Sequence, residues 1–462
     1  MAGTPDNPLR VAVVGSGPAG FYAAGHLMSA KDAVIHVDLI DRLPTPFGLV
    51  RAGVAPDHPK IKSVTRVYEK TAAKEGFRFF GNVEVGRDIS HAELKDSYHA
   101  VVYAYGCESD RSMGIEGEEL PGSWAATDFV AWYNGHPDHQ DLDFDLSSKR
   151  AVVIGNGNVA MDVARMLVLP REELDTTDTT DQAIEAIATS GVEEVVIVGR
   201  RGPAQAAFTN PELRELGELA DADVIVDPAD LELDEHSVHS IEGEGDITPR
   251  RNVEILTDYA GREPGGKRKR VVLRFLRSPV AIHGDGRVES IELVRNELEH
   301  GGDGRLRAQA TGEHETLEAG LVFRSIGYRG RPIEGVPFDE WHGTIPNEEG
   351  RIVDPSTQAS IPGEYVAGWI KRGPSGVIGT NKRDAQETVE HLLEDLAEGR
   401  LPTPPNPDPD AVLALVTERN PDVVSYAGWQ AIDAFEKAAG EALGRPRVKL
   451  TRLADMLDAA RD

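Results

Sequence analysis

Two stretches of the chain share one pattern of hydrophobic and polar positions: an apolar run, a glycine-rich turn, and a run with helical spacing. The first is VAVVGSGPAGFYAAGHL, residues 11–27, and the second is AVVIGNGNVAMDVARML, residues 151–167. A short apolar run that ends at glycine is typical of a buried parallel strand. We therefore predict a strand, a tight turn and a helix twice, with the helices ending near Ser29 and Leu169.

Other apolar runs predict the rest of the fold. We expect strands at 34–40, 101–104, 194–198, 271–276, 288–295 and 321–326, a helix at 63–74, and a short helix within 171–190. Residues 44–62 contain too much proline and glycine for a regular element. A further strand–loop–helix piece at 364–396 precedes a linker-like segment at 400–411 and a helical tail. The simplest arrangement is one unit inserted between two parts of another.

This pattern predicts an α/β fold of two Rossmann-like, three-layer dinucleotide-binding domains. We place the discontinuous domain at 1–110 and 330–462, and the inserted domain at 111–329. The length of 462 residues agrees, because it is long for a single core. No apolar run approaches the ~18 residues of a membrane-spanning helix. The start, MAGTPDNPLR, has no apolar signal core, so we expect a soluble cytoplasmic protein without membrane insertion.

The cysteine content limits the redox chemistry that the chain can perform. The only cysteine is Cys107, which excludes an intramolecular disulfide, a CxxC pair and an iron–sulfur cluster held by this chain alone. We expect no metal site. Any redox chemistry therefore needs a bound organic cofactor.

The formal net charge of -29 disfavours nucleic acid and anionic membranes as partners. The charge is uneven, because residues 212–246 are rich in acid whereas 262–277 contain seven Lys and Arg against one acid. Two interpretations of this basic run stay open. It is a solvated hairpin edge, where cations block edge pairing, or it is a docking patch for an acidic partner.

The first glycine loop has the fingerprint of a dinucleotide site. Gly15 permits the tight turn, Gly17 lets a pyrophosphate approach the backbone, and Gly20 lets helix and strand pack closely. The start of the helix then favours the phosphate charge. The next strand ends in Asp41, the residue type expected to accept a hydrogen bond from a ribose hydroxyl. This combination suits FAD.

The second loop differs at the end of its following strand. Its predicted nucleotide-binding residues are Gly155, Asn156, Gly157, Asn158 and Val159, with Ala160 at the third glycine position. The strand then ends in Arg200 and Arg201, where an adenosine 2'-phosphate would lie. Arginine suits phosphate because its planar fork binds two oxygens. This combination suits NADP(H), although an arginine pair on a solvated loop is the alternative.

Four long segments carry a resemblance to a known family. PTPFGLVRAGVAPDHPKIK, AVVIGNGNVAMDVAR, VGRRGPAQAAFTNPELREL and GWIKRGPSGVIGTN resemble adrenodoxin-reductase-like ferredoxin–NADP reductases of the actinobacterial type. The resemblance covers nearly the whole chain in the right order. It implies an FAD domain built from both ends of the chain and an NADP domain between them.

The resemblance also implies site residues. His58 lies near the flavin and is paired with Glu215, while Glu212 lies by the NADP. Residues implied at the FAD site are Ala19, Leu49, Val85, Arg111, Trp369, Gly376, Val377 and Ile378, and Gly376 also contacts the NADP. Related flavoproteins commonly carry an acid after the glycine of this last strand, but here Gly368 is followed by Trp369. From the residues alone, His58 is typical of a loop-capping histidine and Glu215 of a solvated helix residue.

The combined interpretation is an NADPH-dependent FAD reductase that passes a hydride from NADPH to FAD and then single electrons to an acidic iron–sulfur ferredoxin. We expect a monomer. Two alternatives stay open: an NADPH diaphorase or quinone reductase with the same cofactors, and a non-catalytic flavoprotein.

Overall fold

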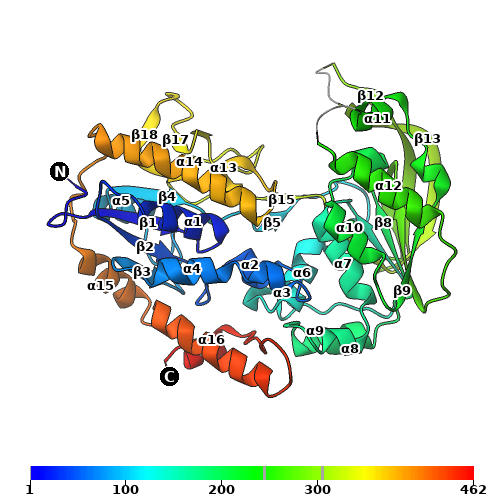
Figure 1. The fold of residues 1–462 in the computed structure, drawn as a ribbon, viewed down its shortest axis with the longest axis horizontal. Coiled ribbons are helices and arrows are strands. Elements are labelled where there is room, and N and C mark those ends of the chain that lie inside the picture. The colour runs from blue at the N-terminus through cyan, green and yellow to red at the C-terminus, as the bar shows by residue number, and fades with distance from the viewer. Residues whose placement is uncertain (1, 243–245, 303–305, 462) are drawn as a thin grey trace. The chain divides into compact units, whose positions relative to one another are not determined.

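The structure, a computed structural model, describes residues 2–242, 246–302 and 306–461. The chain divides into two units (Figure 1). The first is built from both ends of the chain, Met1–Ser109 and Tyr328–Asp462, and the second is the continuous segment Asp110–Gly327. The second unit is therefore an insertion, with crossings at 109/110 and 327/328 where the sequence suggested 110/111 and 329/330.

A seven-stranded sheet forms the centre of the first unit. In spatial order its strands are β16 (Asn347–Glu348), β17 (Arg351–Val353), β18 (Ser360–Val366), β4 (Ala100–Tyr103), β1 (Leu9–Val14), β2 (Ile35–Ile40) and β3 (Phe77–Phe80). The strands from β18 to β3 run parallel, whereas β16, β17 and β18 pair antiparallel. Every residue of β1 is buried, Arg10 included, which agrees with its place in the interior of the sheet.

Alternate side chains of β1 enter two different cores. Val11 and Val13 pack in a cluster with residues of α1 (Pro18–Leu27) and α14 (Ile378–Ala397). Ala12 and Val14 pack in a cluster with residues of α5 (His91–Ser97) and α15 (Pro409–Arg419). Because successive strand residues point to opposite faces, the apolar run from Val11 to Val14 needs helices on both sides of the sheet. The first unit therefore has three layers.

The other elements of the first unit are short, except for one long helix near the C-terminus. They are α2 (Leu49–Ala52), α3 (Pro59–Lys62), α4 (Thr65–Ala72), α13 (Trp369–Arg372), α16 (Tyr426–Glu441) and α17 (Leu453–Ala459). The chain leaves through β5 (Ser109–Asp110) and returns through β15 (Tyr328–Arg329), and these two strands pair.

The second unit contains a six-stranded sheet in which all paired strands are parallel. In spatial order the strands are β6 (Ser123–Ala125), β14 (Leu321–Arg324), β7 (Arg150–Ile154), β8 (Glu194–Val198), β10 (Lys269–Arg274) and β9 (Ala222–Val226). A separate antiparallel sheet contains β11 (Arg277–His283), β12 (Ser290–His300) and β13 (Leu306–Glu318).

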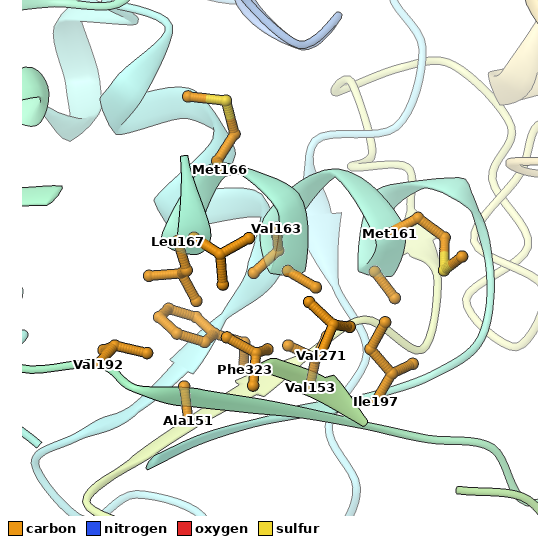
Figure 2. Packing of buried hydrophobic residues seen from close by; sticks show 14 of the residues in the cluster. Ala151, Val153, Met161, Val163, Met166, Leu167, Val192, Ile197, Val271 and Phe323 are labelled. Carbon is orange, nitrogen blue, oxygen red and sulfur yellow. The ribbon is translucent and has the colours of Figure 1, made fainter. Parts of the chain in front are cut away.

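Helices cover one face of this parallel sheet and the antiparallel sheet covers the other. Figure 2 shows Val163 and Leu167 of α7 (Asn158–Val168) above Val153 of β7 and Phe323 of β14. On the opposite face, Val152 packs in a cluster with residues of β11 and β12. The remaining helices are α6 (Ala126–Tyr133), α8 (Arg171–Leu174), α9 (Asp181–Ala188), α10 (Asn210–Leu216), α11 (Glu235–Glu242), α12 (Thr248–Ala260) and the 3-10 helices η1 (Pro137–His139), η2 (Pro203–Gln205) and η3 (Pro228–Leu231).

The predicted α/β fold with Rossmann-like units is confirmed, and several local predictions are wrong. Residues 44–62 are not wholly irregular, because they contain α2 and α3, and proline occupies the first position of α3 without disrupting it. Residues 171–190 form two helices instead of one, and α15 begins inside the predicted linker. Within the described residues, no helix has the length and apolarity to span a membrane, and no His, Cys, Asp and Glu cluster suits a metal ion.

Candidate dinucleotide sites

The first glycine loop, between β1 and α1, is closed on its inner side and open at Gly17. Gly15 has a φ of +103°, and a Cβ there would lie 2.5 Å from the Cα of Tyr105. A Cβ on Gly20 would lie 1.9 Å from the carbonyl oxygen of Gly15, so a side chain would force the helix away from the strand. At Gly17, by contrast, a Cβ would meet no atom within 4 Å. The loop is therefore tight where the fold needs it and open where a phosphate needs room.

The start of α1 also fits a phosphate. Gly17 occupies the N-cap position, and no side chain caps the helix. The first N–H groups of a helix have no partner within it and carry partial positive charge. A ten-residue helix that begins without a side-chain cap, behind an open glycine, suits the pyrophosphate of a dinucleotide. Ala19, in the first turn, is buried.

Asp41 holds the glycine loop itself. Its Oδ2 accepts hydrogen bonds from the main-chain N–H of Ser16 at 2.8 Å and from the Ser16 hydroxyl at 2.6 Å, and its Oδ1 accepts from the N–H of Leu43 at 2.9 Å. The carboxylate thus ties the end of β2 to the loop. Since a carboxylate has about four acceptor positions, it retains capacity for a ribose hydroxyl, and that contact stays a prediction.

Four predicted FAD residues lie on the segment that contains α13 and the start of α14. Trp369 begins α13, and its indole N–H is buried without a partner in the described structure. Gly376 has a φ of +80°, and Val377 and Ile378 form the start of α14. Leu49 begins α2 and is 39% exposed. Their contacts with a flavin stay predictions.

Sequence reasoning missed one acid in this region. Asp384 of α14 accepts a hydrogen bond from the main-chain N–H of Gly368 and pairs with Lys371 at 3.3 Å. The acid at this turn therefore comes from the following helix, sixteen residues along the chain. Asp384 is too far along the chain from Gly368 for the local sequence to reveal this contact.

Two further predicted FAD residues lie apart from these loops. Val85 forms an isolated bridge with Ile89 in the first unit. Arg111 belongs to the second unit, and its main-chain N–H donates to the carbonyl of Gly327 at 3.1 Å. Their roles stay predictions.

The second glycine loop, between β7 and α7, has the same geometry. Gly155 has a φ of +127°, and a Cβ there would lie 2.1 Å from the carbonyl oxygen of Ser325. Gly157 is open, with no atom within 4 Å of a Cβ, and it caps α7 without a side-chain hydrogen bond. The Asn156 Nδ2 is buried without a partner among the described residues. The loop therefore offers unsatisfied donors to a ligand.

The first two residues of α7, which follow the loop, are held in place by the fold. Asn158 accepts a hydrogen bond at Oδ1 from the N–H of Thr209 at 2.9 Å. Val159 is partly buried and packs against the main core of the second unit. Ala160, at the third glycine position, is fully buried, which fits the small residue that close packing of helix and strand requires there.

Arg200 and Arg201 follow the end of β8 after one intervening residue, and hydrogen bonds hold their main-chain carbonyls. The Arg200 carbonyl accepts from Asn296 at 2.9 Å, and the Arg201 carbonyl accepts from the N–H of Leu276 at 3.1 Å. Neither guanidinium has a carboxylate partner in the ranges that the structure describes. Burial and the neighbouring charge of Arg200 lower the pKa of Arg201. Two close cations without a counter-ion fit a phosphate group.

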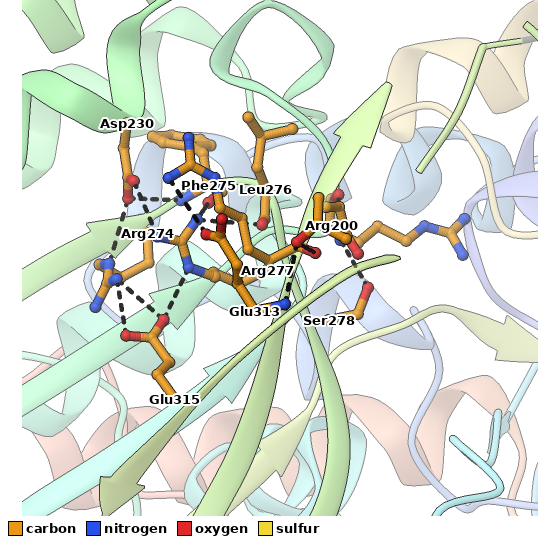
Figure 3. A network of polar contacts seen from close by, with 12 residues as sticks. Arg200, Asp230, Arg274, Phe275, Leu276, Arg277, Ser278, Glu313 and Glu315 are labelled. Carbon is orange, nitrogen blue, oxygen red and sulfur yellow. Dashed lines mark hydrogen bonds and ion pairs between the residues drawn. The ribbon is translucent and has the colours of Figure 1, made fainter. Parts of the chain in front are cut away.

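The basic run at 262–277 is different, because its cations are occupied. Figure 3 shows Arg274 and Arg277 converging on the carboxylates of Asp230 and Glu315. The other arginines are paired as well. Arg262 pairs with Asp258 at 2.6 Å, and Arg268 pairs with Asp221 at 2.9 Å. Arg270 pairs with Glu194. The ammonium groups of Lys267 and Lys269 donate to main-chain carbonyls. This pairing favours the edge interpretation over the docking patch.

Helix α10 places Glu212 and Glu215 in the second unit, beside α7. Glu212 accepts a hydrogen bond from the Thr209 hydroxyl. Burial, together with the charges of Glu212 and Glu215, raises the pKa of Asp162 in α7 well above its usual value, and Asp162 pairs with Arg165 at 2.6 Å. His58, at the start of α3, belongs to the first unit. The pairing of His58 with Glu215 stays a prediction.

Comparison with known proteins identifies the family. Residues 9–216 match the family model described as pyridine nucleotide-disulphide oxidoreductase. NADPH-ferredoxin reductase FprA of Mycobacterium tuberculosis is 52% identical over 458 residues, which cover 97% of this chain and 98% of that protein. The mitochondrial NADPH:adrenodoxin oxidoreductase of Homo sapiens is 45% identical over 467 residues, which cover 98% and 92%. The chain belongs to the adrenodoxin-reductase-like ferredoxin–NADP reductases.

The solved structures agree with this membership. Mycobacterium tuberculosis FprA in complex with NADPH matches with a TM-score of 0.92 and 51% identity, over 99% of this chain and 100% of that one. The resemblance predicted from the four segments is thus confirmed. The chain is an oxidoreductase with a single cysteine, so it has no cysteine pair for disulfide chemistry of its own.

Proposed function

We propose that this ferredoxin–NADP reductase uses its first unit to bind FAD and its second to bind NADP(H), and that it passes electrons from NADPH to an iron–sulfur ferredoxin. The two relatives above, an NADPH-ferredoxin reductase and an NADPH:adrenodoxin oxidoreductase, support this function. In the chain itself, the observation that carries it is the position of Arg200 and Arg201 at the end of β8 without carboxylate partners in the described residues.

Each residue set has a separate task in this function. When bound, the two cofactors supply hydride transfer and the conversion of an electron pair into single electrons. The open loops at Gly17 and Gly157 receive the pyrophosphates, and Arg200 and Arg201 bind the 2'-phosphate that distinguishes NADPH from NADH. Trp369, whose indole N–H is buried without a partner in the described structure, borders the flavin.

His58 and Glu215 act by orientation and charge. Hydride transfer needs no protein acid or base, so these side chains are not required to move a proton in that step. Burial, together with the charges of Glu212 and Glu215, raises the pKa of Asp162, so Glu215 lies in a region of α10 and α7 that is rich in carboxylates.

The finer properties of the partner are part of the proposal. An acidic ferredoxin would be repelled at long range by a chain with a net charge of -29, so docking needs local cations. At about 0.15 M salt the screening length is about 8 Å, and nearby charges then outweigh distant ones. Arg214 of α10 is exposed and has no carboxylate partner in the described ranges. We also propose a monomer that works in the cytoplasm.

Electron delivery from NADPH to cytochrome c, with and without ferredoxin, tests the function. The proposal expects slow reduction by the enzyme alone and strong stimulation by a ferredoxin. An NADPH diaphorase or quinone reductase would instead turn over rapidly with its own acceptor, and ferredoxin would not change that rate. A non-catalytic flavoprotein would reduce neither cytochrome c nor any other acceptor, because NADPH would leave its flavin oxidised.

A further inference from the structure

A short segment before and within α2 lies directly on the first glycine loop. The main-chain N–H of Phe47 donates to the carbonyl of Ser16 at 3.0 Å. Gly48 has a φ of +50°, and a Cβ there would lie 2.9 Å from the Cα of Gly17. The backbone at residues 47–48 is therefore a wall of the space in front of Gly17, where the pyrophosphate of FAD would lie. A small movement of this segment would change that space.

The backbone of the segment is strained and needs to be held. Phe47 has a φ of +85°, which is unfavourable for a bulky residue. Its ring packs against Phe21, with centroids 5.3 Å apart, and perpendicular to Trp429 of α16 at 5.6 Å. Such strain persists only where the surroundings fix the conformation. Trp429 shows that α16 is part of those surroundings.

A buried ion pair joins the same helix to α2. Both terminal nitrogens of Arg51 donate to the carboxylate of Glu436, one of them at 2.8 Å, across 385 residues of sequence. The Glu436 side chain is fully buried and also accepts from Arg447 at 3.0 Å and from the N–H of Leu450 at 2.9 Å. The Arg51 guanidinium lies 5.3 Å from the Trp429 ring centroid.

Glu436 is held in its ionised form despite its burial. Burial opposes ionisation of Glu436, but Arg51 and Arg447 hold the pKa of its carboxyl below the usual value. The Arg51 carbonyl also accepts a hydrogen bond from the Lys449 ammonium at 3.2 Å. Side chain and backbone of α2 are thus both attached to the C-terminal segment.

We propose that Glu436, acting through Arg51, is a positioning residue for FAD. The pair holds α2 so that residues 47–48 keep the space at Gly17 in its binding form, and α16 thereby sets FAD affinity. The proposal rests on FAD binding at the first loop and not on the identity of the electron acceptor. Its failure would therefore leave a yellow, NADPH-reducible enzyme whose FAD affinity does not depend on α16.

The test measures FAD binding to apoprotein, by quenching of FAD fluorescence, in E436Q, R51K and the control E364Q. Glu364 is also a buried, ion-paired glutamate of the first unit, bonded to Lys95 at 2.7 Å and His91 at 2.9 Å. We expect E436Q to raise the dissociation constant of FAD by about tenfold or more and to change the visible spectrum of the bound flavin. R51K keeps the positive charge but loses the two-nitrogen contact of the guanidinium with Glu436. We expect it to raise the dissociation constant of FAD by only about threefold.

The control separates positioning from a general loss of stability. E364Q is expected to lower the thermal midpoint of the apoprotein while its dissociation constant for FAD stays within about twofold of the wild-type value. The proposal is overturned if E436Q binds FAD within twofold of wild type, or if E436Q and E364Q weaken FAD equally. If E436Q yields no folded apoprotein, R51K decides, and an unchanged dissociation constant there overturns the proposal.

Discussion

Two arginine-rich regions of the second unit are similar in sequence and differ in what surrounds their cations. At the end of β8, Arg200 and Arg201 have no carboxylate partner in the described ranges. In the basic run at 262–277, Arg274 and Arg277 share two carboxylates, and the more exposed arginines pair with acids of neighbouring elements. The number of cations therefore does not show which ones can bind an anion. What decides is whether the fold has already supplied the counter-ion.

The largest expected effect is at the unpaired site. Replacing both arginines in R200Q/R201Q removes two charge-assisted contacts, each worth about 1.5–3 kcal/mol. The kcat/KM for NADPH should fall about 100-fold or more, while the value for NADH changes little. Steady-state kinetics with both nucleotides measure this. An equal loss for NADPH and NADH would show that the arginine pair is structural.

A smaller effect, on stability, is expected at Lys269. This cation of the basic run has no carboxylate partner of its own in the described structure. Burial lowers its pKa from 10.5 to about 8, and its ammonium donates to the carbonyl of Leu167 at 2.9 Å. Between these two pKa values the unfolded chain binds the proton and the folded chain does not, so stability rises with pH in that window. Relative to K269M, the wild type should gain roughly 3 kcal/mol from pH 8 to 10.5.

Urea unfolding of both proteins across that pH range provides the measurement. The comparison between the two proteins cancels the titration of other groups. Parallel stability curves for wild type and K269M would contradict the lowered pKa. A curve that falls for the wild type alone would mean that the ammonium is stabilised by its surroundings instead of penalised.

Much of this fold follows from local sequence, and much of the site does not. The two loops, their strands and their helices are local, because the glycines and apolar runs that specify them are adjacent in the chain. The pairing of the basic run is not: Arg270 meets Glu194 across 76 residues and Arg274 meets Glu315 across 41. Asp41 was expected to face the ribose, but its hydrogen bonds to Ser16 could only be seen once β2 and the loop were in place. The same holds for Asp384, which reaches Gly368 from a later helix.

The smallest expected effect is at the exposed part of the basic run. R268Q/R270Q also replaces two arginines by glutamine in the second unit, so it is a matched control for R200Q/R201Q. Both side chains are more than half exposed, and exposed ion pairs contribute about 0–1 kcal/mol. We expect less than about twofold change in kcat/KM for NADPH and in the rate of ferredoxin reduction. A marked loss of ferredoxin reduction with normal ferricyanide turnover would restore the docking interpretation.

We propose that one unit binds FAD and that the other selects NADPH to reduce it. Anaerobic stopped-flow mixing of the purified enzyme with NADPH, and separately with NADH, measures this directly through the visible absorbance of oxidised flavin. The account predicts that NADPH removes this absorbance rapidly, and that NADH at the same concentration does so far more slowly. Flavin that stays oxidised with NADPH, or equal rates with the two nucleotides, would contradict it.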